Sequence, residues 1–276
     1  MEERKKNQPW KIVYQNIRSL VSENSRVKID YFNEYVEENK IIIMNFTETW
    51  LNDTIKDEAK INGYNEYRGD RKDIKQGGTA IYLQEKIEGE LISNFSKNNC
   101  EMVAIKIPSL NAINIVTYRP PHTKIIDFKP LIDKIRETIF NILDRPDPTI
   151  IWTGDFNFPF VQWKECKSGG TTWNFNPEMN ASADEKEQFR SIMNLCCNFN
   201  LIQTITEPTR GNNTLDYIFT NELDLFSSYD VSHSALSDHY FIEIGTSFKT
   251  EEITKNQKNK EKDGLRKLNF FSNKVN

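Results

Sequence analysis

Short apolar runs separated by polar and turn-forming residues recur along the chain. These runs are rich in Ile, Val, Tyr and Thr and are bounded by Gly, Pro, Asn or Asp, which is the composition of β-strands. The pattern predicts strands at Lys11–Ile17, Ile41–Thr47, Thr79–Leu83, Met102–Ile107, Ile113–Tyr118, Thr149–Gly154, Leu201–Ile205, Leu215–Phe219 and Tyr240–Thr246.

Three further segments place apolar residues at helical spacing, three or four positions apart. They predict helices around Val27–Val36, Phe128–Leu143 and Phe189–Phe199. A regular βα barrel needs a helix after each strand, and this chain has too few. Two packed sheets with helices on their outer faces suit the pattern better.

The pattern divides the chain into one domain with two extensions. Residues 10–248 hold every predicted strand and helix, within the size range of one large α/β domain. Residues 1–9 read as an N-terminal extension, and residues 249–276, rich in Lys, Asn and Glu, as a linker-like tail. Within the domain, Phe158–Asp184 is long and irregular and contains several aromatic residues, so we expect a loop there that is either functional or disordered.

The composition is that of a globular intracellular protein. Hydrophobic residues make up 37% of the 276, enough for a sizeable core. No apolar run reaches the length of a membrane span, and the first residues lack the apolar segment of a secretory signal. The four cysteines form no C-x-x-C pair and have no histidine at zinc-finger spacing, which argues against zinc.

The net charge of −4 does not by itself identify a substrate. Proteins that bind nucleic acids usually present basic surfaces. Here the segment from Lys249 onward carries 8 basic and 4 acidic residues, so the rest of the chain is more acidic than the whole. Acidic residues around a metal ion and an ordinary solvated surface would both explain that excess.

Polar side chains of one chemical kind stand at the ends of the predicted strands. Carboxylates and amides there, with one histidine, suit a hard cation with oxygen ligands and a phosphoryl centre. Each alone is more often a turn, a cap or a packed side chain. Their order along the chain is the stronger signal, and it comprises Asn16, Glu48, Tyr118, Asp155, Asn157, Asp216, Ser237, Asp238 and His239.

This order resembles the endonuclease/exonuclease/phosphatase superfamily, and within it the endonucleases of LINE-type (non-LTR) retrotransposons. The resemblance spans roughly residues 10–247. TYRPP, TGDFNFP with a following Trp, and TEPTR…LDYIFTN are similar to the retrotransposon branch, whereas GDFN and SDH occur across the superfamily. The resemblance implies a DNase I-like fold, which is a four-layer α/β/β/α sandwich.

The resemblance also implies residue roles. Glu48 would ligate Mg²⁺, for which Mn²⁺ is a substitute, with Asn16 beside it. Asp155 would activate the attacking water and Asn157 would hold it or the phosphate. His239 would contact the scissile phosphate, with Asp216 orienting its ring, and Tyr118 would stabilise the developing charge. Ser237 and Asp238 would support this group.

One position departs from the DNA-repair relatives, which often carry a second acidic residue where this chain has Arg18. This weakens the prediction of a second metal ligand and the repair reading with it. Expected DNA contacts are Arg18, Arg119, Arg210 and Trp163. Solvated arginines and a packed tryptophan are the structural alternatives for these four.

The predicted activity is nicking of double-stranded DNA to leave 3′-hydroxyl and 5′-phosphate ends, and this substrate implies the nucleus. A reverse transcriptase follows the domain in such elements, so we expect the chain to be a fragment, a truncated copy or a domesticated protein. Alternatives are an abasic-site repair enzyme or a lipid or inositol phosphodiesterase of the same fold. An inactive binding module is a third, although all the expected site residues are present.

Overall fold

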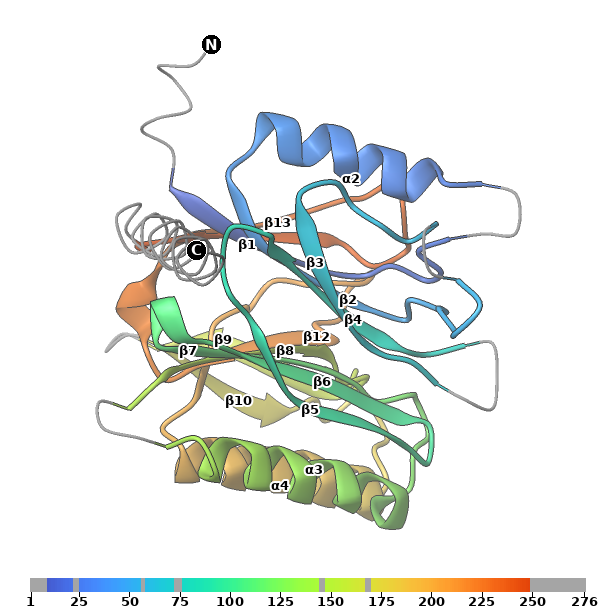
Figure 1. Ribbon diagram of the computed structural model, residues 1–276. Helices are drawn as coiled ribbons and strands as arrows, with labels where there is room; N and C mark the ends of the chain where they lie inside the picture. The colour runs from blue at the N-terminus through green and yellow to red at the C-terminus, as the bar shows by residue number, and fades with distance from the viewer. Residues whose placement is uncertain are drawn as a thin grey trace, which may run out of the picture.

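The computed structural model describes residues 9–21, 25–55, 58–71, 76–143, 147–166 and 170–248. Within them, two six-stranded sheets lie face to face, with helices on both outer surfaces (Figure 1). Most of the predicted extension at 1–9 and the whole predicted tail at 249–276 lie outside the described residues. No described helix has both the length and the apolar character needed to cross a lipid bilayer.

The first sheet has the order β13-β14-β1-β2-β4-β3. Its central strands β1 and β2 run parallel, and β14 and β4 flank them antiparallel. Its strands, in chain order, are β1 (Trp10–Asn16), β2 (Ile41–Thr47), β3 (Tyr64–Gly69), β4 (Thr79–Gln84), β13 (Phe226–Ser232) and β14 (Phe241–Thr246).

The second sheet has the order β11-β12-β8-β7-β6-β5, with a parallel central pair, β7 and β8. β6 and β12 flank that pair antiparallel, so the two sheets share one plan. Its strands are β5 (Glu90–Lys97), β6 (Cys100–Ile107), β7 (Ala112–Tyr118), β8 (Thr149–Asp155), β11 (Ile202–Gln203) and β12 (Asp216–Thr220).

The helices cover the outer faces of the sheets. In Figure 1, α2 (Val27–Glu38) lies over the first sheet, and α3 (Ile125–Phe140) and α4 (Ala183–Asn198) lie together over the second. A hairpin of β9 (Val161–Glu165) and β10 (Thr171–Phe175) packs beside α4. Two short 3₁₀ turns are η1 (Pro108–Leu110) and η2 (Leu223–Leu225).

Three separate apolar cores hold the four layers together, one for each pair of adjacent layers. Phe32 of α2 packs against Phe46 of β2 in the first core. Ile43 and Val116 lie in the second, between the sheets, and Trp152 and Phe189 in the third, under α3 and α4. Each helix therefore buries one face, which carries its apolar residues, as the helical spacing predicts.

The predicted four-layer sandwich is confirmed, and so are the three helices, although α4 begins six residues before the predicted Phe189. Predicted Leu201–Ile205 shortens to the two-residue β11. The structure adds β3, β5 and β13, which the apolar pattern did not predict. The prediction of an irregular loop over Phe158–Asp184 is wrong for much of its length, because the β9–β10 hairpin forms there.

Candidate active site

The predicted site residues meet at one end of the sandwich, because each sheet presents the ends of its parallel pair there. Asn16 ends β1 and Glu48 follows β2 in the first sheet. Tyr118 ends β7 and Asp155 ends β8 in the second, and the two pair across the strands. Carboxyl ends of parallel strands open on the same edge, so side chains from both sheets converge.

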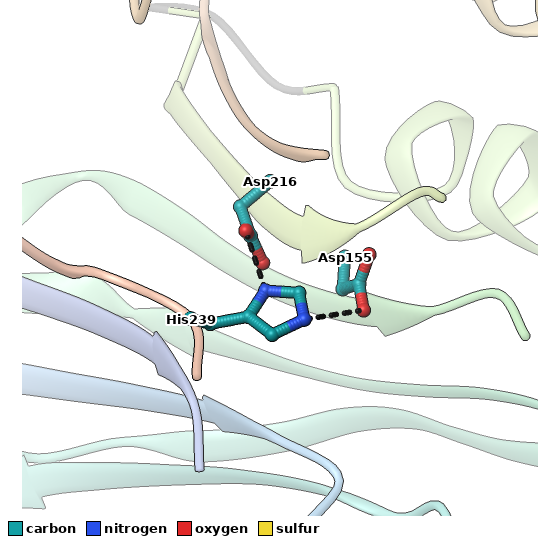
Figure 2. Close-up of side chains that lie close together, drawn as sticks. All are labelled: Asp155, Asp216 and His239. Atoms are coloured by element: carbon teal, nitrogen blue, oxygen red, sulfur yellow. Dashed lines mark hydrogen bonds and ion pairs between the residues drawn. The ribbon is translucent and has the colours of Figure 1, made fainter. Parts of the chain in front are cut away.

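His239 lies between two buried carboxylates, as Figure 2 shows. Its Nδ1 is 2.8 Å from Oδ2 of Asp216, and its Nε2 is 3.9 Å from Oδ2 of Asp155. All three side chains are 1% exposed. Asp216 opens β12 directly opposite Asp155 on β8, so the sheet register fixes the separation of the two carboxylates.

Charge within this group fixes the protonation of the imidazole. Burial alone would lower the pKa of His239, but the charge and hydrogen bond of Asp216 and the charge of Asp155 raise it to about 9. At neutral pH the ring is therefore an imidazolium that donates from Nδ1 to Asp216. Burial, and then the charge of Asp216, raise the pKa of Asp155 above its ordinary value of 3.8.

Two side chains of β1, in the first sheet, support this group. Tyr14 donates its hydroxyl to Oδ1 of Asp216 at 2.8 Å and lies 2.9 Å from the Thr47 hydroxyl. Gln15 donates to the backbone oxygen of His239 at 2.9 Å. Side chains of β1 thus anchor both Asp216 of β12 and His239, which lies in the loop before β14.

Glu48 occupies a left-handed turn after β2, with φ of 50°. Its Oε1 accepts from the Tyr118 hydroxyl at 2.8 Å and from the Asn16 amide at 3.3 Å, and its Oε2 accepts from the Trp50 indole at 3.2 Å. A left-handed turn is strained for Glu, and such strain is typical of functional positions. Burial and the charge of Glu48 raise the pKa of Tyr118, so its hydroxyl remains a donor.

The donor set around Glu48 fits a hard divalent cation. The Asn16 amide donates to Glu48 and, at 2.8 Å, to Oδ2 of Asp155, so one neutral group separates two carboxylates. After burial and the charge of Asp216, the charge of Glu48 also raises the pKa of Asp155, as expected for like charges that lie close together. Carboxylate and amide oxygens are ligands that Mg²⁺ and Mn²⁺ accept.

Asp155, Asp216 and His239 also bring ligand atoms within 4.8 Å of one another. A protonated imidazole cannot coordinate a metal ion, and Nδ1 of His239 is already hydrogen-bonded to Asp216. Glu48, with Asn16 beside it, is the other place where a cation could be held.

Asn157 lies next to this group in a second left-handed turn, with φ of 52°. Its backbone N–H donates to Oδ1 of Asp155 at 3.1 Å, and its amide donates to the backbone oxygen of Arg119 at 2.8 Å. The turn after β8 therefore fixes Asp155 and Asn157 relative to each other.

Two arginines border the site on the side of His239. Arg18 and Arg210 donate to the same carboxylate oxygen of Asp238, at 3.0 and 2.5 Å. Burial would raise the pKa of Asp238, but both arginines outweigh it and lower that pKa. Their side chains are 48% and 41% exposed, so they remain accessible to a ligand with net positive charge left over. Ser237, the other predicted support, accepts from the backbone N–H of His239 at 3.3 Å.

Two of the predicted DNA contacts are buried. Arg119 is 1% exposed and Trp163 is 7% exposed. Trp163 packs its ring against Phe189 and Tyr217 beneath the β9–β10 hairpin. The prediction that these two side chains contact DNA requires them to be exposed, and both are buried. Neither is retained as a DNA contact.

Four residues of the site region were not predicted from the sequence, namely Tyr14, Gln15, Arg71 and Glu101. Tyr14 shares the face of β1 with Asn16, two positions on, and this spacing is a usable signal. Arg71 pairs with the buried Glu101 and lies 5.8 Å from the Tyr118 ring centroid, which only the fold brings together. Neither pairing leaves a trace in local sequence spacing.

Comparison with known families gives one match that covers most of the chain. The sequence model of the endonuclease/exonuclease/phosphatase family matches residues 10–239. That interval includes every residue of the site described above. A search of curated protein sequences found no match.

Solved structures similar to this fold include several nucleic-acid enzymes. An AP endonuclease from Archaeoglobus fulgidus has a TM-score of 0.60 at 16% identity, covering 87% of this chain and 100% of its own. The endonuclease domain of TRAS1, a telomere-specific non-LTR retrotransposon, has a TM-score of 0.58 at 14% identity, covering 88% and 100%. A Neisseria 3′ phosphatase, NExo, bound to a product DNA hairpin has a TM-score of 0.58 at 12% identity, covering 86% and 99%. At these identities the likeness shows the fold.

Proposed function

The chain belongs to the endonuclease/exonuclease/phosphatase family of phosphoester hydrolases, and from that premise we propose that it is a Mg²⁺-dependent endonuclease that nicks double-stranded DNA. The observation that supports this most is the buried group of His239, Asp216 and Asp155 beside the partly buried Glu48. It combines a cationic donor, a carboxylate base and an oxygen-ligand site within one sandwich edge.

The proposed reaction is hydrolysis of one phosphodiester bond. Asp155 takes a proton from water, the water oxygen bonds to phosphorus, and the bond from phosphorus to the 3′ oxygen breaks. The leaving 3′ oxygen takes up a proton from solvent, and Asp155 returns its proton to solvent, so that the carboxylate is ready for the next turnover. The His239 imidazolium donates from Nε2 to a non-bridging oxygen and so stabilises the added negative charge. Tyr118 and Asn157 donate to the same phosphoryl group. The products are a 3′-hydroxyl and a 5′-phosphate.

Glu48 and Asn16 would hold the metal ion. A bound Mg²⁺ would neutralise phosphate charge as a Lewis acid, and Mn²⁺ would replace it because both accept oxygen ligands. The Tyr118 and Trp50 donors orient the Glu48 carboxylate whether or not the ion is bound.

DNA is the proposed substrate because two accessible arginines border the site. Arg18 and Arg210 lie on either side of the single Asp238 carboxylate, which leaves one positive charge for a phosphate next to the scissile one. The similar retrotransposon endonuclease domain supports target-site cleavage as the biological role. There the new 3′-hydroxyl would prime a reverse transcriptase following in the same polypeptide, and the site of action would be the nucleus.

Plasmid nicking tests this proposal. The purified chain is expected to convert supercoiled plasmid to open circles with Mg²⁺ or Mn²⁺ and not with EDTA. Because an AP endonuclease has a similar fold, a duplex with one abasic site should be assayed as a second substrate. A preference of about 100-fold or more for the abasic duplex would replace our proposal with a repair enzyme. If the folded protein cleaves neither DNA, the remaining functions are a lipid or inositol phosphodiesterase and an inactive binding module.

Replacing Glu48 with glutamine is expected to raise the Mg²⁺ concentration for half-maximal nicking at least about 10-fold, because an amide is a weaker ligand than a carboxylate. Titration of nicking rate against Mg²⁺ measures this. Glu137→Gln, an exposed helix position on α3, is the matched control and should leave the titration unchanged. An unchanged titration for Glu48→Gln would remove Glu48 from the metal site.

Replacing Arg18 and Arg210 together with alanine is expected to raise KM for DNA while kcat changes little. If each arginine contacts a phosphate, the dependence of log KM on log salt should lose about one unit of slope per arginine. Nicking rates over a salt series measure both quantities. Arg136→Ala on α3, where Arg136 forms an exposed pair with Asp133, is the control. A fall in kcat at unchanged slope would contradict a DNA-contact role.

A further inference from the structure

Arg119 is a buried cation directly behind the catalytic loop. It follows β7, and its backbone N–H donates to the backbone oxygen of Asp155 at 3.0 Å. Its side chain is 1% exposed, so it reaches neither solvent nor DNA. A buried arginine is costly to maintain unless its donors are used, which makes its partners informative.

The guanidinium ties the loop after β8 to a helix. Nη1 donates to the backbone oxygens of Phe156 and Asn157, at 3.0 and 3.3 Å, and Nε donates to Oε1 of Gln188 on α4 at 2.8 Å. In return the Asn157 amide donates to the backbone oxygen of Arg119 at 2.8 Å. Arg119 and Asn157 therefore hold each other through two reciprocal hydrogen bonds.

Gln188 is itself fixed, so the tie is rigid. Its Nε2 donates to the Thr123 backbone oxygen at 2.6 Å and to Oδ2 of Asp184 at 2.7 Å. That leaves Oε1 facing the guanidinium, and the side chain is fully buried. Arg119 thus links the Asp155–Asn157 turn to α4 and fixes the position of the turn relative to that helix.

The charge of Arg119 has no carboxylate partner in the salt bridges that the described residues form. Burial lowers its pKa, although a guanidinium stays protonated at any physiological pH. The Phe158 ring centroid lies 4.2 Å from its central carbon, and Nη2 is buried with no hydrogen-bond partner among these residues. The charges of Glu185 and Asp155 act on the guanidinium from a distance and oppose the effect of burial.

We propose that Arg119 is a positioning residue for the hydrolysis, acting through Asn157. It holds the two carbonyls of the turn so that Asn157 keeps its left-handed conformation and presents its amide to the phosphoryl group. The inference rests on the proposed nuclease function. A displacement of about 1 Å in a group that positions substrate can cost about 100-fold in rate, so loss of this tie should appear in kcat.

A double-mutant cycle between Arg119 and Asn157 tests the inference. Arg119→Met keeps much of the length without the donors, and is expected to lower kcat for plasmid nicking about 10- to 100-fold with KM within about 3-fold. In an Asn157→Ala background the same change should cost less than about 3-fold, because its effect passes through Asn157. Equal losses in both backgrounds would show that Arg119 acts independently of Asn157 and would overturn the inference.

Two further measurements keep the outcomes distinct. Circular dichroism melts establish that each variant is folded at the assay temperature. If Arg119→Met does not fold, the cycle is run with Arg119→Lys, which keeps the charge but cannot reach Gln188 and both carbonyls together. If the wild-type chain nicks neither plasmid nor abasic duplex, the proposed function has failed; if it nicks and the cycle shows no coupling, only this inference has failed.

Discussion

Replacing His239 with alanine is expected to lower kcat for plasmid nicking by about 1000-fold or more. The imidazolium, the proposed donor to the phosphoryl group, is buried between Asp155 and Asp216, and no other cation among the described residues occupies that place. Removing a positioned proton donor typically costs about 100- to 10,000-fold, and loss of a charge in a buried site adds to this. Single-turnover nicking with Mg²⁺ at pH 7.5 measures the chemical step.

The chain supplies a matched control for this variant. His233 contacts Tyr240 ring to ring at 4.1 Å and lies outside the buried group, so His233→Ala should nick at the wild-type rate. The melting temperature of each variant separates chemistry from folding. If His239→Ala retained more than a tenth of the wild-type rate, the imidazole would not be the phosphate donor, and Tyr118 would be the next residue to replace.

The site could be predicted because its residues stand at strand ends, where a sequence marks them clearly. Glu48, Tyr118 and Asp155 each follow or close a run of buried apolar residues. In a sheet with a parallel central pair, such ends meet on one edge, so the convergence follows from topology. Their order along the chain then resembled a known family, and no local rule alone would have joined residues so far apart.

The missed strands lie at sheet edges or beside them, where burial imposes no apolar pattern. β13 reads FSSYDVS and is mostly exposed, and β5 reads ELISNFSK. An edge strand is fixed by pairing with its neighbour rather than by its own composition, so its sequence resembles a loop. The β9–β10 hairpin was missed for a different reason, since its Gly-rich connection and aromatic residues suggested an exposed loop.

Burial of individual polar residues was the least predictable property. Arg119 and Trp163 stand in sequence motifs next to the site, and both suggested contact with DNA. The third core, between the second sheet and α4, takes up both side chains. A residue next to the site becomes buried or exposed according to its contacts with residues far away in the sequence. Arg119, for example, is held in the interior by Gln188.

Replacing Asp216 with asparagine is expected to lower kcat at pH 7.5 by about 100-fold or more and to move the pH optimum to lower pH. Oδ1 of Asp216 accepts from Tyr14, so an asparagine would keep its oxygen there and turn its NH₂ toward Nδ1 of His239. An NH₂ donates, and Nδ1 can accept only when unprotonated, so the imidazolium would be disfavoured. The consequence resembles loss of the orienting carboxylate in a catalytic triad, which is severe.

The direction of the pH shift follows from the charges. In the wild-type chain activity needs protonated His239, whose pKa is raised to about 9, and ionised Asp155, whose pKa is also raised. The rate should thus rise as Asp155 loses its proton and fall as pH passes about 9. Without Asp216, His239 would lose the charge and hydrogen bond that raise its pKa most, so burial would lower that pKa with the charge of Asp155 still opposing it, and Asp155 would lose a neighbour that raises its own pKa. Both limbs of the profile therefore move to lower pH.

A pH–rate profile of Asp216→Asn from pH 5 to pH 10 measures this shift, with Asp230→Asn, an exposed carboxylate on β13, as the control. Partial recovery of nicking below pH 6.5, at pH values where the wild-type rate declines, is the expected signature, because protonation from solvent then restores the imidazolium. A loss that is uniform across pH would mean that Asp216 only holds His239 in place. In that case the charge of Asp216 would not control the protonation of His239.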